Sequence, residues 1–207
     1  MLETAPVWLF AGLGILAIAG LLCLRQVRRD LRERQQLRVG TAFTVWAVYF
    51  AFTGAAIWVS WQGILPLPLH PVFASIAGTA LILFGVGFTA AGMLEFRSFA
   101  RMSGRRQDRL VKSGVYRWSR NPQNVGWGFA LLGIAIAGKS GLALVFALFF
   151  WTALRLYIPT EERHLARAYG EEWRDFRDST PRFFGPPRRG EQRSIPHTSL
   201  EAPPESS

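Results

Sequence analysis

The sequence predicts an all-α integral membrane protein, a helical bundle of about five transmembrane helices. Three observations lead to this fold class. Half of the 207 residues are hydrophobic and only 18% are charged, whereas an ordinary soluble chain carries about 25% charged residues. Long stretches of the chain contain no charged residue at all. The net charge of +10 is concentrated in short segments between those stretches.

The composition also excludes several classes of protein. A single cysteine excludes an internal disulfide and a thiolate zinc site, and three scattered histidines argue against a metal centre. We therefore expect no metal. There is no glycine-rich phosphate loop, which excludes a soluble nucleotide-binding domain. The excess of arginine is confined to two segments, so we expect no nucleic-acid partner and infer that membrane lipids explain the charge.

The first three spans are bounded by charges and prolines. Residues 7–24 form an apolar run of 18 residues, enough to cross a hydrocarbon core of about 30 Å. An arginine-rich segment follows this run, which favours a retained anchor over a cleaved signal peptide. Residues 39–94 contain no Lys, Arg, Asp or Glu, and three prolines between 66 and 71 divide them. We expect spans at about 41–65 and 71–94.

Two shorter apolar segments follow, at about 122–137 and 142–157, on either side of a Gly-Lys-Ser-Gly turn at 138–141. They predict a closely packed helical hairpin. Small residues at four-residue spacing, Gly126 with Ala130 and Ala143 with Ala147, are expected to bring the two helices of this hairpin together.

The basic segments predict the orientation. Residues 25–38 carry six arginines against two acidic residues, and residues 95–120 carry eight basic residues against two acidic ones. By the positive-inside rule both segments lie in the cytoplasm, with the N-terminus outside and the C-terminus inside. We expect the plasma (inner) membrane, a single domain over 1–185 and a disordered tail over 186–207.

The segment that leads into the fourth span is the first candidate site. It reads Gly-Val-Tyr-Arg-Trp-Ser-Arg-Asn-Pro-Gln-Asn-Val-Gly from Gly114 to Gly126. Asn121 before Pro122 predicts an N-cap followed by proline at the first helical position. One interpretation is only a clean helix start with Arg117 and Arg120 as membrane anchors. The other is an anion site, since a helix N-terminus flanked by arginine attracts a carboxylate or phosphate.

A second polar element follows Pro159. Thr160 is a plausible N-cap for a separate amphipathic helix at about 160–178, lying against the membrane face. Glu161 and Glu162 open this helix. They could simply complement the helix dipole. However, a glutamate on the packed side of a helix beside a membrane needs a cationic partner, either an arginine or the ammonium or sulfonium of a ligand.

Together, these elements resemble the isoprenylcysteine carboxyl methyltransferase family and the related phospholipid N-methyltransferases. The resemblance rests on Gly-x-Tyr-Arg-x-x-Arg-Asn-Pro-x-x-x-Gly, a short apolar hairpin, Glu-Glu-Arg-x-Leu, Tyr-Gly-Glu-Glu-Trp and a closing Pro-Arg-Phe. It covers about Gly114 to Gly185.

The resemblance implies a membrane enzyme that transfers a methyl group from S-adenosylmethionine to a lipophilic acceptor reached from the bilayer. The cofactor pocket would face the cytoplasm. The motif match carries over a set of cofactor-binding residues: Tyr116, Arg117, Arg120, Asn121, Pro122, Gly126, Glu161 and Glu162. Of these, Arg120, Asn121 and Glu162 are the expected catalytic residues.

The chain also departs from the family pattern. Many relatives have histidine where this chain has Asn121, and Met-Tyr where it has Gln123-Asn124. Asparagine cannot titrate, so a proton-transfer role at this position is not expected. Two other functions stay open: an NADPH-dependent sterol or steroid reductase, whose hairpin signature is similar, and a membrane scaffold that has lost its cofactor.

Overall fold

A computed structural model describes residues 7–34, 36–96 and 110–188 of the chain. Helix follows helix in this order: α1 (Val7–Arg34), α2 (Val39–Trp61), α3 (Pro71–Glu95), the short 3-10 helix η1 (Gly114–Arg117), α5 (Pro122–Ala137) and α6 (Gly141–Ser179). The described ranges contain no β-strand, only an isolated bridge between Pro66 and Ser140. The predicted fold class, an all-α membrane bundle, is confirmed. Of the predicted tail, residues 189–207 lie outside the described residues.

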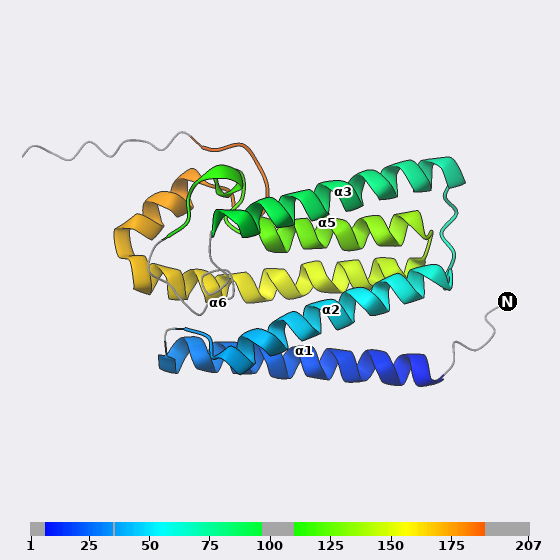
Figure 1. The fold of residues 1–207 in the computed structure, drawn as a ribbon, viewed down its shortest axis with the longest axis horizontal. Helices are drawn as coiled ribbons and strands as arrows, with labels where there is room; N and C mark the ends of the chain where they lie inside the picture. The colour runs from blue at the N-terminus through cyan, green and yellow to red at the C-terminus, as the bar shows by residue number, and fades with distance from the viewer. Residues whose placement is uncertain (1–6, 35, 97–109, 189–207) are drawn as a thin grey trace, which may run out of the picture.

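The long helices run side by side along the long axis of the molecule (Figure 1). The α3–α5 pair lies on one side of α6, and the α1–α2 pair lies on the other. The α2–α3 and α5–α6 connections lie at the end where α1 begins, and η1 and the last part of α6 lie at the opposite end. The arginine-rich end of α1 is therefore at the same end of the bundle as η1, as the predicted topology requires. The direction of the bundle in a membrane stays a prediction.

Three described helices are long and apolar enough to cross a membrane: α2, α3 and α6. The other two predicted spans are also helical, but α5 has only 16 residues and α1 continues through the arginine-rich segment to Arg34. The segment predicted as the first cytoplasmic loop is thus mostly helix. Five spans remain the prediction, with three of them supported by length and composition.

The arginine-rich end of α1 is fixed to α2 through a buried carboxylate. Asp30 is fully buried, and its oxygens accept hydrogen bonds from the Thr41 hydroxyl at 2.5 Å and the Arg38 backbone N–H at 3.1 Å. The Arg38 guanidinium lies 3.1 Å from the same carboxylate. A buried charge needs such partners, and these partners join the end of α1 to the start of α2.

The closest helix contact joins α5 to α3, and this corrects the prediction that the small residues of α5 face α6. A Cβ atom on Gly126 would lie 2.5 Å from the Gly85 carbonyl oxygen, and one on Gly85 would lie 2.5 Å from the Ala130 nitrogen. Further along, a Cβ atom on Gly133 would lie 2.7 Å from the Gly78 carbonyl oxygen. The backbones approach because α3 carries glycine at 78, 85 and 92, a seven-residue spacing that places all three on one face.

Helix α6 corrects a second prediction. Pro159 does not end the helix of the predicted fifth span, and Thr160 caps no new helix: the helix continues through both and bends instead at Gly170, where φ is +54°. An interior proline costs a helix about 3 kcal/mol. Leu154, Ile158 and Glu162 are all buried, so one packed stripe with four-residue spacing crosses the proline. This burial on both sides offsets the cost.

Candidate functional site

A cavity of about 530 Å³ connects the polar end of the bundle to its apolar interior. Most of its wall is apolar and comes from α1, α2 and the first half of α6. At the polar end the lining includes Tyr116, Arg120, Asn121 and Glu161. The two segments singled out by the sequence therefore meet at one end of one cavity.

Arg120 is the buried cation of this site. It follows η1, and its backbone N–H donates to the Pro181 carbonyl oxygen at 2.9 Å, which fixes the segment against the chain that follows α6. Its side chain is only 8% exposed and its guanidinium lies 5.8 Å from the centre of the Trp173 ring, a cation–π distance. Its buried Nε atom has no hydrogen-bond partner among the described residues.

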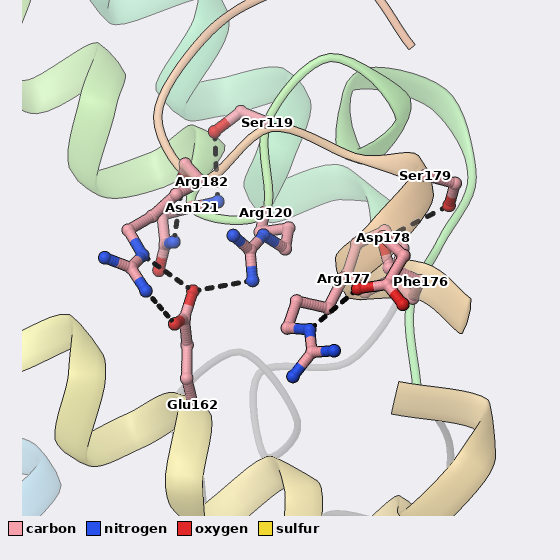
Figure 2. Close-up of polar contacts among 9 residues, drawn as sticks. All are labelled: Ser119, Arg120, Asn121, Glu162, Phe176, Arg177, Asp178, Ser179 and Arg182. Carbon is pink, nitrogen blue, oxygen red and sulfur yellow. Dashed lines mark hydrogen bonds and ion pairs between the residues drawn. The ribbon is translucent and has the colours of Figure 1, made fainter. Parts of the chain in front are cut away.

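Glu162 lies between two arginines, as Figure 2 shows. One carboxylate oxygen lies 2.8 Å from Nη1 of Arg120. The Arg182 guanidinium binds both oxygens, with Nε at 3.1 Å and Nη2 at 2.7 Å. Bidentate pairs of this kind are the strong form of the arginine–carboxylate contact. The cationic partner that the sequence analysis required is thus protein, and Glu162 is not among the residues that line the cavity.

Glu161, one residue earlier, has the opposite environment. It lines the cavity and lies beyond the apolar stretch of α6 that ends at Tyr157. Within the described part of the chain it makes no ion pair or hydrogen bond. Burial, followed by the negative charge of Glu162, raises the pKa of the Glu161 carboxyl to about 7. The cavity thus contains a carboxyl group whose charge changes near neutral pH.

Asn121 occupies the predicted N-cap position, but its side chain does not cap α5. Its Nδ2 atom instead donates to the Arg182 carbonyl oxygen at 3.0 Å, and its backbone N–H donates to the Ser119 hydroxyl, also at 3.0 Å (Figure 2). The helix start relies on Pro122, whose fixed φ suits the first helical position. The amide is thereby used to hold the segment after α6 over the site.

The remaining predicted residues divide into two groups. Tyr116 is buried and lines the cavity, with its ring 5.7 Å from that of Phe96 in an edge-to-face contact. Arg117 is exposed, and neither Pro122 nor Gly126 lines the cavity; these two pack against α3. The structure therefore joins four predicted residues at the cavity and places four outside it.

The sequence did not predict the role of Arg182, nor the part of the cavity wall that Tyr49, Gln123 and Asn124 form. Arg182 belongs to the closing Pro-Arg-Phe motif, which was the available signal. Tyr49 of α2 donates a hydrogen bond to Asn124 Oδ1 at 2.8 Å, and both residues line the cavity. Gln123 also lines it, and its buried Nε2 atom has no partner in the described ranges. No signal pointed to Tyr49, because it lies in an apolar span without a motif.

The chain is similar in sequence to several known proteins. The sequence model of the phospholipid methyltransferase family matches residues 73–172. The rat protein-S-isoprenylcysteine O-methyltransferase is 31% identical over 113 residues, which is 52% of this chain and 39% of the rat protein. The human protein of the same name is 29% identical over 112 residues, with the same shares of the two chains. The cobalt-zinc-cadmium resistance protein CzcN of Cupriavidus metallidurans is 32% identical over 167 residues, 75% of this chain and 69% of that protein.

The chain belongs to the isoprenylcysteine and phospholipid methyltransferase family. It spans about two fifths of the length of the isoprenylcysteine methyltransferases that it matches. No solved structure matches it.

The part matched by the family model is the polar end of the cavity together with the helices that carry it. Residues 73–172 include most of α3, all of η1 and α5, and α6 as far as the bend. Helices α1 and α2, which supply much of the apolar wall, lie outside the match, as does Arg182. No group of three or more His, Cys, Asp and Glu residues in the described ranges could hold a metal ion.

Proposed function

We propose that the chain is an S-adenosylmethionine-dependent methyltransferase that acts on a lipophilic acceptor. The observation that carries this proposal is one continuous cavity, whose polar end is made by the two motif segments and whose apolar remainder lies between membrane helices. The family description names phospholipids, and the rat and human relatives are named for an isoprenylcysteine. Both are lipophilic, which supports this acceptor class.

The charges at the polar end fit the amino-acid part of S-adenosylmethionine. That part carries one carboxylate and one ammonium group. Arg120 offers a buried Nε–H that has no partner among the described residues, and Glu161 offers a carboxylate that is equally without one. We assign the cofactor carboxylate to Arg120 and the ammonium to Glu161. When bound, the cofactor supplies a methyl group on a sulfonium, and such a cation gains from nearby aromatic rings such as that of Tyr116.

Glu162 and Asn121 are assigned positioning roles. Glu162 pairs with both Arg120 and Arg182, so Arg120 keeps one orientation toward the cavity. Asn121 holds the Arg182 backbone in place. Methyl transfer by displacement depends mainly on the orientation of the reacting groups and on exclusion of water. A rigid polar end and a dry apolar wall supply both.

The acceptor is assigned to the apolar part of the cavity. Residues from α1, α2 and α6 line this part, and the outer faces of these helices are apolar and exposed, as lipid-facing surfaces are. An acceptor would therefore pass from the bilayer without crossing water. The polar end would face the cytoplasm of the plasma (inner) membrane, since the arginine-rich end of α1 lies at that end together with Arg117 and Arg120 (Figure 1).

The deciding experiment is calorimetric titration of S-adenosylhomocysteine into the protein in nanodiscs, with NADPH as the second ligand. We expect saturable micromolar binding of S-adenosylhomocysteine and none of NADPH. Glu161→Gln should weaken binding at least tenfold, because an ion pair with the ligand is lost. Glu171→Gln is the matched control, since Glu171 is on the same helix and exposed.

The two alternatives give different results in the same titration. Binding of NADPH instead would replace the methyltransferase proposal by a reductase. If neither ligand binds and the protein still unfolds cooperatively on heating, the result would favour a membrane scaffold.

A further inference from the structure

A second hollow lies between α1 and α2, outside the main cavity. Its volume is about 600 Å³. Cys23 and Val48 line both hollows, so their side chains form the wall between them. The proposed reaction does not use this groove, which we call the α1–α2 groove.

The lining of the α1–α2 groove changes from apolar to basic along α1. Ala19 and Leu22 line one end, and Arg25, Gln26 and Arg29 line the other. These positions follow each other at three- and four-residue spacings, which places them on one face of the helix. The change occurs where the apolar run of 7–24 ends, which is the predicted end of the first span.

The basic end is not neutralised by nearby acids. Arg25 is exposed and makes no ion pair within the described part of the chain. Arg29 lies 2.9 Å from Glu33, but both side chains are about half exposed or more, so this pair is weak. The other acidic residue of the segment, Asp30, is buried and bound to Arg38 and Thr41. The groove therefore presents an excess of positive charge beside an apolar channel.

We propose that the α1–α2 groove binds a phospholipid with a net negative headgroup. The acyl chains would lie along Leu22 and Val48, and the headgroup phosphate would contact Arg25 and Arg29. The Gln26 amide, which also lines the groove, donates one hydrogen bond to Asp30 at 3.2 Å and has a second N–H that can donate to a phosphate oxygen. This site is separate from the cofactor pocket and stands whether or not the proposed function is correct.

Native mass spectrometry of the full chain in detergent tests the site. Phosphatidylglycerol and phosphatidylcholine with the same acyl chains are titrated separately, and the bound lipid is counted. We expect the wild-type protein to retain phosphatidylglycerol at least about tenfold better than phosphatidylcholine. The reason is that each of the two arginines near the headgroup adds electrostatic attraction to the anionic lipid. The double variant Arg25→Gln/Arg29→Gln should lose this preference.

The matched control is Arg32→Gln/Arg34→Gln, which removes the same charge from the same end of α1 but from residues that do not line the groove. It should keep the preference for phosphatidylglycerol. Soluble glycerol phosphate should not bind at the same concentration, because it has no acyl chains to contact the apolar end of the groove. Equal loss in both double variants, or no preference in the wild-type protein, would overturn the proposal. Thermal unfolding of all variants verifies that they are folded.

Discussion

Two adjacent glutamates in α6 have different environments, and this difference determines the chemistry of the site. Glu162 is bound by Arg120 and Arg182, whereas Glu161 faces the cavity with no partner among the described residues. The positions of the two are 100° apart on a helix, so one turns toward the segment after α6 and the other toward the cavity. In the proposed function, two neighbouring residues of one motif therefore have different roles: Glu162 positions Arg120, and Glu161 binds the ligand.

Removing the Glu162 charge should destabilise the protein. In Glu162→Gln the buried Arg120 loses its counter-ion, and breaking a buried pair costs about 3 kcal/mol of unfolding free energy. Thermal unfolding in nanodiscs measures the loss. Glu171→Gln, which affects an exposed pair with Arg174, should change stability by less than about 0.5 kcal/mol. Equal effects of the two variants would contradict the proposed positioning role.

Titration of Glu161 should make ligand binding depend on pH. Its pKa is raised from 4.5 to about 7, so the carboxyl is neutral below pH 7 and charged above it. If the charged form binds the ligand ammonium, S-adenosylhomocysteine affinity should fall as pH drops below about 7, by up to about tenfold per pH unit. Calorimetry at several pH values measures this.

The same group gives the opposite trend in the stability of the ligand-free protein. Between pH 4.5 and 7 the folded state holds a proton on Glu161 that the unfolded state has released, so stability falls as pH rises through this window. Glu161→Gln should flatten both profiles. A variant that keeps the pH dependence of binding would exclude Glu161 as the ammonium ligand.

At the scale of elements, the sequence located the helices well and their contacts less well. Spans at about 71–94 and 122–137 agree closely with α3 and α5, because charges and prolines bound them. The helix break expected at Pro159 was wrong. The sequence shows only the local cost of a proline inside a helix. The burial that offsets this cost comes from contacts of α6 with other helices, which the local sequence does not show. Arg182 could not be assigned for a similar reason, as it is 20 residues from its partner Glu162.

The close contact between α3 and α5 should tolerate no side chain at Gly85. A Cβ atom there would lie 2.5 Å from backbone atoms of α5, and such overpacking costs about 1–3 kcal/mol. We expect Gly85→Ala to lower the unfolding temperature. Gly87→Ala is the matched control, because nothing lies within 4 Å of a Cβ at Gly87. It should be neutral, and a similar loss in both variants would refute the close contact.

At the scale of the whole molecule, the cavity is lined both by residues that the family model matches and by residues outside that match. The polar end belongs to residues matched by that model, whereas α1 and α2 lie outside the match. The proposed division of labour follows: the matched part holds the cofactor, and α1 and α2 select the acceptor. Substitutions in α1 should then affect the acceptor and leave the cofactor alone.

Gly20 of α1 tests this division. It lines the cavity, and a Cβ there meets nothing within 4 Å, so Gly20→Phe should project a ring into the space assigned to the acceptor. We expect transfer of labelled methyl groups into a membrane-lipid extract to fall at least tenfold, with unchanged S-adenosylhomocysteine binding. Gly14→Phe, on the same helix but outside the cavity lining, is the control. Loss of cofactor binding in Gly20→Phe would contradict the division.

The contact of Arg182 with Glu162 has a consequence for biosynthesis. Arg182 follows the last helix, so a nascent chain that has not reached residue 182 contains Glu162 and Arg120 but lacks one of the two arginines that bind Glu162. The segment at 181–185, which binds the backbone of 118–120, is also among the last parts of the described chain to be translated. The proposed binding site is therefore complete only after residues 181–185 have been translated. We expect a chain that stops before residue 181 not to hold the proposed cofactor.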